Sequence, residues 1–151
     1  MFELGIPDRN AALLAVAALH RGVSVIRVYG NNAAMPSSPG DAIGAATLLA
    51  VFTEADDGST GLSMALTAAN GVLLKDSGEV WMATVIANGT ATFYRKSALA
   101  DAGGASITEP RVQGSVGVVN ADLLFSTVDW IIGDEKRIDS YAWGQPEQAA
   151  A

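Results

Sequence analysis

The chain of 151 residues contains no cysteine and a single histidine, His20. No disulfide and no thiolate metal ligand is therefore possible, and stability must come from packing, backbone pairing and contacts with partner subunits. A zinc site is unsupported for the same reason, because His20 has no second histidine or cysteine to join it. We expect His20 to end a helix and interact with its dipole rather than to act as a general base.

Basic residues are also few: nine Lys and Arg stand against sixteen Asp and Glu, which gives a formal net charge of −7. Such a chain repels phosphate backbones, and no basic cluster reverses this locally, so we expect no nucleic-acid partner. The apolar run at residues 11–19 is short and rich in alanine. It lacks the basic leader of a signal peptide and the length of a membrane span, so we expect a cytoplasmic origin and no membrane partner.

Half of the residues are hydrophobic and only 17% are charged, a composition that favours a folded domain with a buried core. The spacing predicts a helix over residues 9–21, with Asp8 as its N-cap and Gly22 at its end. After Gly22 the period changes to alternation, and turn signals such as Asn70-Gly71 recur between β-rich segments. The expected strands cover residues 23–29, 45–54, 62–68, 72–75, 79–86, 90–96, 111–116, 122–126 and 136–143.

Many short strands after one helix predict a mainly β chain: an antiparallel β-sandwich, immunoglobulin-like or jelly-roll-like, with one N-terminal α-helix. We expect an N-terminal arm and helix at residues 1–22, the β-sandwich domain at 23–144 and a flexible tail at 145–151. The strand at 23–29 has apolar residues on both faces, which predicts that it lies in the interior of the sandwich.

No catalytic, metal-binding or cofactor-binding motif stands out. A Ser-His-Asp triad would have to include His20, and no nucleophile-elbow pattern is present. The acidic segment Asp56-Asp57-Gly58 lacks the ligand spacing of a calcium loop and is typical of a turn. Neither glycine-rich segment, at 58–61 or 114–117, continues into a phosphate-binding loop. A glycosidase pair among the sixteen acidic residues stays open, although nothing selects one. We therefore expect no catalytic residue, no metal, no cofactor and no enzymatic activity.

The three tryptophans leave two interpretations open. Trp81, Trp130 and Trp143 would form a stacking platform for sugars if exposed, but aromatic residues in alternating strands are more often core or interface residues. Tyr141 and Trp143 share a strand face near the C-terminus. For these two we weigh contact with a partner chain equally against burial in the core.

Two expected loops, at residues 31–44 and 97–110, are long for a domain of this size, and such loops are commonly functional or fixed by partners. Together with the helix they are the expected contact surfaces. The candidate interface residues are Leu13, Val16, His20, Tyr29, Met35, Pro36, Leu99, Ile107, Tyr141 and Trp143.

Three segments carry a resemblance to a known family. Residues 21–49 (RGVSVIRVYGNNAAMPSSPGDAIGAATLL) combine a helix end, a strand that closes in Tyr29-Gly30, a Pro-containing loop and a second strand. Residues 89–95 (GTATFYR) and 113–117 (QGSVG), the latter followed by Asp122-Leu123, complete the pattern. In this order they resemble small structural proteins encoded among the head and tail morphogenesis genes of tailed bacteriophages. The long loop before residue 113 and the aromatic, charged end depart from that pattern.

The resemblance implies a non-enzymatic virion protein made in the host bacterial cytoplasm. We expect it to be head-associated, as a capsid decoration or cement protein or a head–tail junction (connector) protein, acting through symmetric protein–protein contacts. Its expected partners are other virion proteins (major capsid, neck or tail proteins) and further copies of itself in an oligomer. The alternatives are a tail component, or a β-sandwich module that binds a host-surface glycan. An enzyme is the least expected class.

Overall fold

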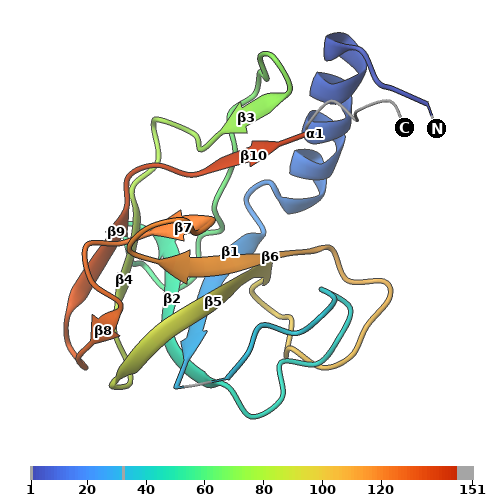
Figure 1. Ribbon diagram of the computed structural model, residues 1–151. Coiled ribbons are helices and arrows are strands. Elements are labelled where there is room, and N and C mark those ends of the chain that lie inside the picture. The colour runs from blue at the N-terminus through green and yellow to red at the C-terminus, as the bar shows by residue number, and fades with distance from the viewer. Residues whose placement is uncertain (1, 32, 146–151) are drawn as a thin grey trace.

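The computed structural model describes residues 2–31 and 33–145, and in them one helix is followed by ten short strands (Figure 1). In chain order these are α1 (Ile6–His20), β1 (Ser24–Gly30), β2 (Thr47–Glu54), β3 (Val72–Leu74), β4 (Trp81–Thr84), β5 (Gly89–Ala98), β6 (Arg111–Gly117), β7 (Leu123–Leu124), β8 (Asp129–Trp130), β9 (Glu135–Ile138) and β10 (Ala142–Gly144).

Helix α1 begins at Ile6, earlier than predicted, because Pro7 fits the first turn, where a backbone N–H has no partner to lose. The N-cap is Gly5 and has no side-chain cap, so the prediction of Asp8 as N-cap is wrong. Asp8 lies instead in the first turn, where its charge suits the positive end of the helix dipole. The helix ends as predicted before Gly22, which takes a φ of +69° that favours glycine.

Eight strands form one curled sheet, in which neighbours follow the order β7-β6-β5-β1-β2-β4-β9 and β8 pairs with β5 (Figure 1). The pair of β6 with β7 is parallel, and the other pairs are antiparallel. Strand β1 lies between β2 and β5 and is buried at every position but Arg27. It is therefore a central, buried strand of this sheet, and its place in a sandwich stays a prediction.

A separate two-stranded sheet, β10 with β3, lies beside α1 at the upper end of the molecule in Figure 1. The predicted turn Asn70-Gly71 precedes β3, and its residues take the positive φ values of +52° and +73° that a tight hairpin turn requires. Residues 62–68, expected as a strand, instead pair through isolated bridges at Leu62 and Met64.

The expected strand at residues 136–143 is wrong as a single element. Ile138 and Tyr141 are both buried, and positions three apart cannot point to the same face of one strand. The chain breaks between them: β9 pairs with β4 in the curled sheet, whereas β10 crosses to β3.

The mainly β architecture with one N-terminal helix is confirmed. The immunoglobulin-like or jelly-roll-like subtype stays a prediction, because the strands pair as one curled sheet with the small β10–β3 sheet at its end. The predicted flexible tail lies outside the described residues, except for Gln145.

The two faces of β1 and β5 have different coverings, and this difference positions the candidate site. Ile26, Val28 and Tyr94 belong to the main hydrophobic core. On the opposite face Tyr29 stacks on Phe93, with ring centroids 5.2 Å apart. Two long loops cover this second face.

Candidate functional site

One face of the β6-β5-β1 part of the sheet carries a row of polar side chains. Arg27, Arg95 and Gln113 are cross-strand neighbours, and Arg111 lies opposite Ser97. Such neighbours project from the same face. Arg95 is only 1% exposed, and a buried guanidinium requires hydrogen-bond acceptors. The acceptors come largely from the first loop (residues 33–46) and the second loop (residues 99–110), which together we call the loop layer.

Arg111 holds the second loop. Its Nε and Nη2 donate to the carboxylate of Asp101 at 2.7 and 2.8 Å, and the two side chains are 2% and 4% exposed. The same guanidinium donates to the carbonyl of Gly104 at 2.7 Å and, across to the first loop, to that of Pro39 at 3.1 Å. The hydrogen bonds from Arg111 lower the pKa of Asp101 to about 2, so the pair is ionised at neutral pH.

Arg95 and Gln113 hold the first loop. Arg95 donates to the carbonyl of Asp41 at 2.9 Å and to Oε1 of Gln113 at 2.9 Å. The Nε2 of Gln113 donates in turn to the carbonyl of Pro36 at 2.6 Å. A planar side chain with several donors therefore anchors each loop to the sheet.

The two loops are also bonded to each other. The N–H of Ile43 donates to the carbonyl of Gly103 at 2.9 Å, and the N–H of Ser106 donates to that of Gly40 at 2.9 Å. The predicted long loops are confirmed, and they form one connected layer over the sheet. Ile107, at 101% exposure, projects fully from this layer.

His20 lies in the interior, where α1 meets β1. It is 2% exposed, its Nδ1 is 2.6 Å from Oγ of Ser24, and its ring meets that of Trp143 edge-on at 5.8 Å. Burial, and then the charge of Lys96, lower the pKa of His20 to about 4. Because the ring is neutral at pH 7 and closed to solvent, it is not placed to exchange protons with a substrate.

Lys96 is fully buried on the core side of β5. Its Nζ donates to the carbonyl of Leu62 at 3.3 Å. Burial lowers the pKa of Lys96 to about 7, against the opposing charge of Glu79. This lysine therefore stands inside the hydrophobic core, away from the surface.

The aromatic residues for which the sequence allowed two interpretations are core residues. Trp81, Trp130 and Trp143 are 0%, 2% and 9% exposed, so they form no surface platform for a sugar. Trp143 Nε1 donates to the hydroxyl of Tyr141 at 2.8 Å, and that hydroxyl lies 2.8 Å from the hydroxyl of Tyr94. Burial raises the pKa of Tyr141 to about 12. Of the two interpretations of Tyr141 and Trp143, burial in the core is the one observed.

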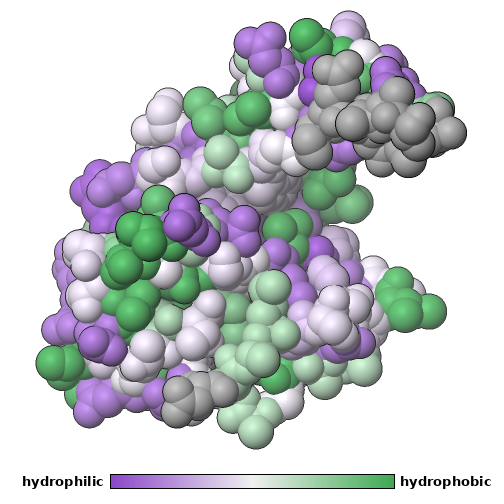
Figure 2. Space-filling model, viewed as in Figure 1, coloured by the Kyte–Doolittle hydropathy of each residue, from purple (hydrophilic) through white to green (hydrophobic). Residues whose placement is uncertain are grey.

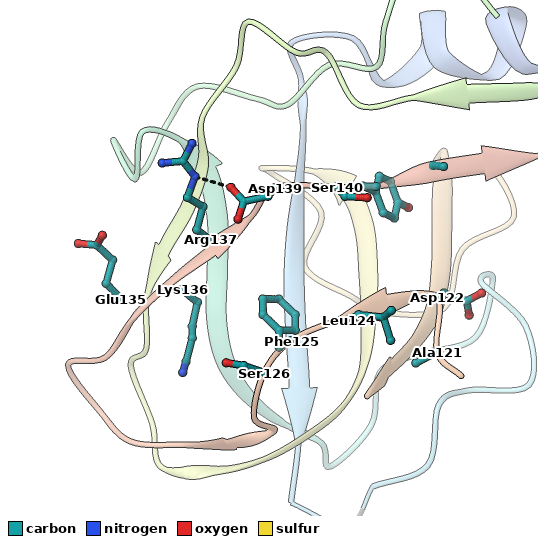
Figure 3. A pocket seen from close by; sticks show the side chains of 12 residues that line it. Ala121, Asp122, Leu124, Phe125, Ser126, Glu135, Lys136, Arg137, Asp139 and Ser140 are labelled. Atoms are coloured by element: carbon teal, nitrogen blue, oxygen red, sulfur yellow. Dashed lines mark ion pairs between the residues drawn. The ribbon is translucent and has the colours of Figure 1, made fainter. Parts of the chain in front are cut away.

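An open groove of about 600 Å³ lies between β7 and the segment from β9 to β10 (Figure 3). Leu124 and Phe125 line it from the β7 side, and Arg137 and Asp139 from the other, with their ion pair at 2.6 Å. Phe125 packs against Trp130 at 5.0 Å between centroids, in an edge-on arrangement. The groove is therefore charged at its rim, and the ring of Phe125 that lines it also packs against the core residue Trp130.

A second groove, of about 320 Å³, separates α1 from β6, and Figure 2 shows the hollow between the upper and lower parts of the molecule. Its lining includes Leu13, Val16 and Trp143. Side chains predicted to contact a partner therefore line this groove, on the inner side of α1.

The charges that remain outside are almost all negative. All nine Lys and Arg contact acceptors of the chain itself, seven of them through backbone carbonyls. Arg137 is the one basic residue classed as exposed in the described chain, and it pairs with Asp139. The exposed acidic residues are Glu3, Asp8, Asp41, Asp56, Asp57, Glu109, Asp122, Asp129, Glu135 and Asp139. A neutral or basic partner surface therefore stays a prediction.

Large hydrophobic side chains gather at two further places. Val118, Val119 and Leu124, each more than half exposed, lie at β7 and in the turn before it, where Figure 2 shows hydrophobic side chains. The other group, which we call the isoleucine patch, lies in the turns after β4 and β8 and consists of Ile86, Ile131 and Ile132.

The structure separates the ten candidate interface residues into two groups. The buried group consists of Leu13, His20, Tyr29, Tyr141 and Trp143, which are core residues of the chain itself. Val16, Met35, Leu99 and Ile107 are at least 40% exposed, and Pro36 is half-buried. Contact of any of them with a partner stays a prediction.

Sequence reasoning missed Arg95, Asp101 and Arg111. One signal could have found Arg95: it precedes Lys96 in a strand, and consecutive side chains point to opposite faces. When both faces of such a strand are covered, two adjacent charges must both be buried. Asp101 carried no comparable signal, because its partner is fixed by the path of the second loop.

Within residues 2–31 and 33–145, no group of three or more His, Asp or Glu side chains is placed to hold a metal ion. In the same residues, no helix has the length and apolar character needed to cross a membrane. Comparison of the chain with protein-family models, curated proteins and solved structures gives no match.

Removal of one partner of the Arg111–Asp101 pair should strongly destabilise the fold. Arg111→Met leaves a buried carboxylate without its partner, and we expect it to cost about 3–5 kcal/mol in free energy of unfolding. Asp101→Leu should cost a similar amount, and the double variant less than the sum, because the pair is then removed together. Urea denaturation of the four proteins measures this coupling.

The exposed Arg137–Asp139 pair, whose side chains are 58% and 76% exposed, is the matched control. Arg137→Met should cost less than about 1 kcal/mol. Equal costs for the buried and the exposed arginine would contradict the anchoring role of Arg111.

His20 should titrate far below the usual range. Its folded pKa of about 4 lies below the unfolded value of 6.5, so the neutral ring contributes stability that is complete above pH 6.5 and is lost as the pH falls towards 4. NMR of the ring protons gives this pKa directly, because the chain has no other histidine. Lys96→Met should raise it, since the charge of Lys96 lowers it. A wild-type pKa near 6.5 would show that His20 is not buried.

Proposed function

We propose that the chain is a non-enzymatic structural component of a tailed-bacteriophage virion, associated with the head as a decoration or cement protein or at the head–tail junction. The observation that carries the proposal is the loop layer, in which buried guanidinium groups fix the backbone that exposes Met35, Leu99 and Ile107. A contact loop that is already ordered loses little conformational entropy on docking. In a shell or ring, symmetry repeats each such contact, so weak contacts add up.

Two further observations favour a contact role over a catalytic or sugar-binding one. His20 is neutral and closed to solvent, and the three tryptophan rings are buried. The exterior is acidic, with exposed apolar side chains at several places. These properties suit a protein that packs against neutral or basic protein surfaces.

The proposed location in a virion rests on the sequence resemblance. The proposed head-associated role rests on the loop layer, which suits contacts that are repeated by symmetry. A tail component is the alternative within the same class. A decoration or cement protein differs in copy number from a head–tail junction or tail protein, because a shell has many equivalent positions and a ring has few.

The test is the copy number of the chain relative to the major capsid protein in purified particles of the phage that encodes it, measured by quantitative mass spectrometry. We expect a ratio near one or a simple fraction of it, which indicates a lattice-wide decoration or cement protein. A very small but fixed ratio would indicate a neck or tail ring. Absence from the particle would contradict the virion role altogether.

A further inference from the structure

The isoleucine patch lies where two turns meet at one end of the curled sheet. One turn follows β4 (residues 85–88) and the other follows β8 (residues 131–134). The N–H of Val85 donates to the carbonyl of Asp134 at 2.8 Å, and the N–H of Gly133 donates to that of Val85 at 2.9 Å. The two turns therefore form one surface, at the lower left of Figure 1.

Hydrogen bonds fix the backbone of all three isoleucines. The N–H of Ile132 donates to Oδ1 of Asn88 at 2.7 Å, and the N–H of Ile131 donates to Oδ2 of Asp134 at 3.2 Å. The N–H of Ile86 donates to a carbonyl of β2 at 2.8 Å. Val85 precedes Ile86 and Trp130 precedes Ile131, and both of these preceding side chains are buried in the core. The three isoleucine side chains are 53–62% exposed. The hydrogen-bonded turns thus fix the backbone of the patch while its side chains stay exposed to solvent.

Acidic side chains lie in and beside the second turn of the patch. Asp129 and Glu135 are exposed on either side of the second turn, and the side chain of Asp134 within it is 43% exposed. The neighbouring cation, Lys136, lies over the ring of Trp130 at 5.5 Å and 3.8 Å from Asp134, with 15% of its side chain exposed. An apolar centre with a charged rim is the usual anatomy of a protein–protein contact surface.

We infer that the isoleucine patch docks onto a second virion protein whose contact surface combines an apolar recess with basic side chains. Charge complementarity selects this partner, because the patch of another copy would bring acidic rims together, which is repulsive. In Figure 1 the patch lies at the lower left and the loop layer extends to the lower right, so the chain can contact two neighbours at once. This inference rests on the proposed function and adds the chemistry of one partner.

The test uses phage that carries the double substitution Ile131→Ser and Ile132→Ser in the gene for the chain. We expect at least about a tenfold fall in copies per particle, since the apolar centre of the contact is lost. The matched control is Leu66→Ser with Leu74→Ser, which removes two side chains that are 74% and 59% exposed near α1. The control should keep the wild-type copy number, and unchanged thermal unfolding of each purified variant shows that all of them fold.

A second variant, Asp129→Asn with Glu135→Gln, tests the rim. Wild-type chain should be released from particles as salt rises, whereas the rim variant should bind less at low salt and respond less to salt.

If the variant with Ile131→Ser and Ile132→Ser reaches the wild-type copy number per particle, the isoleucine patch is not the docking surface, while the proposed virion role is unaffected. If salt releases the rim variant in the same way as the wild-type chain, the inference of a basic partner surface is overturned. Particles without any wild-type chain would contradict the proposed function and this inference with it.

Discussion

The buried guanidinium groups of Arg95 and Arg111 support the whole loop layer. The described residues 33–46 and 99–110 contain no helix or strand, and the sequence contains no cysteine that could cross-link them. Their carbonyl groups must nevertheless be satisfied where they lie against the sheet. Arginine suits this task because one planar group offers five donors, and Arg111 uses them on one carboxylate and two carbonyls.

This use of cations explains the character of the surface. Seven of the nine basic residues bind backbone carbonyls, so their charges are directed towards the chain rather than towards solvent. Ten acidic residues are exposed, whereas Arg137 is the one exposed Lys or Arg among the described residues, so the exposed charges are mainly negative. The same set of side chains thus stabilises the loops and leaves a mainly acidic exterior, which suits the neutral or basic partner proposed above.

Local features of the fold were predictable from the sequence. The helix, the burial of both faces of β1 and the turn at Asn70-Gly71 follow from periodicity and from residues that tolerate positive φ. The break between β9 and β10 was not predictable in this way, because alternation continues through residues 136–143 while the pairing partner changes from β4 to β3. Pairing across long stretches of chain, rather than local pattern, decides such a break.

The candidate surfaces were predictable only in part. Loop length identified the two loops, but the anchors Arg95 and Asp41 are 54 residues apart in the sequence, and no local spacing joins them. Burial of Tyr141 and Trp143 likewise depends on Tyr94, which lies on another strand. The isoleucine patch had no sequence signal, because the apolar run 130–132 reads equally well as part of a buried strand.

The hydrogen bonds described above make the loop layer a fixed part of the fold. Hydrogen–deuterium exchange at the amides of Ile43 and Ser106, which donate across the two loops, measures this rigidity. We expect strong protection of both amides, close to that of the β1 and β5 amides, and loss of this protection in Arg111→Met. Exchange of both amides at the rate of an unstructured chain in the wild-type protein would show that the loop layer is not fixed.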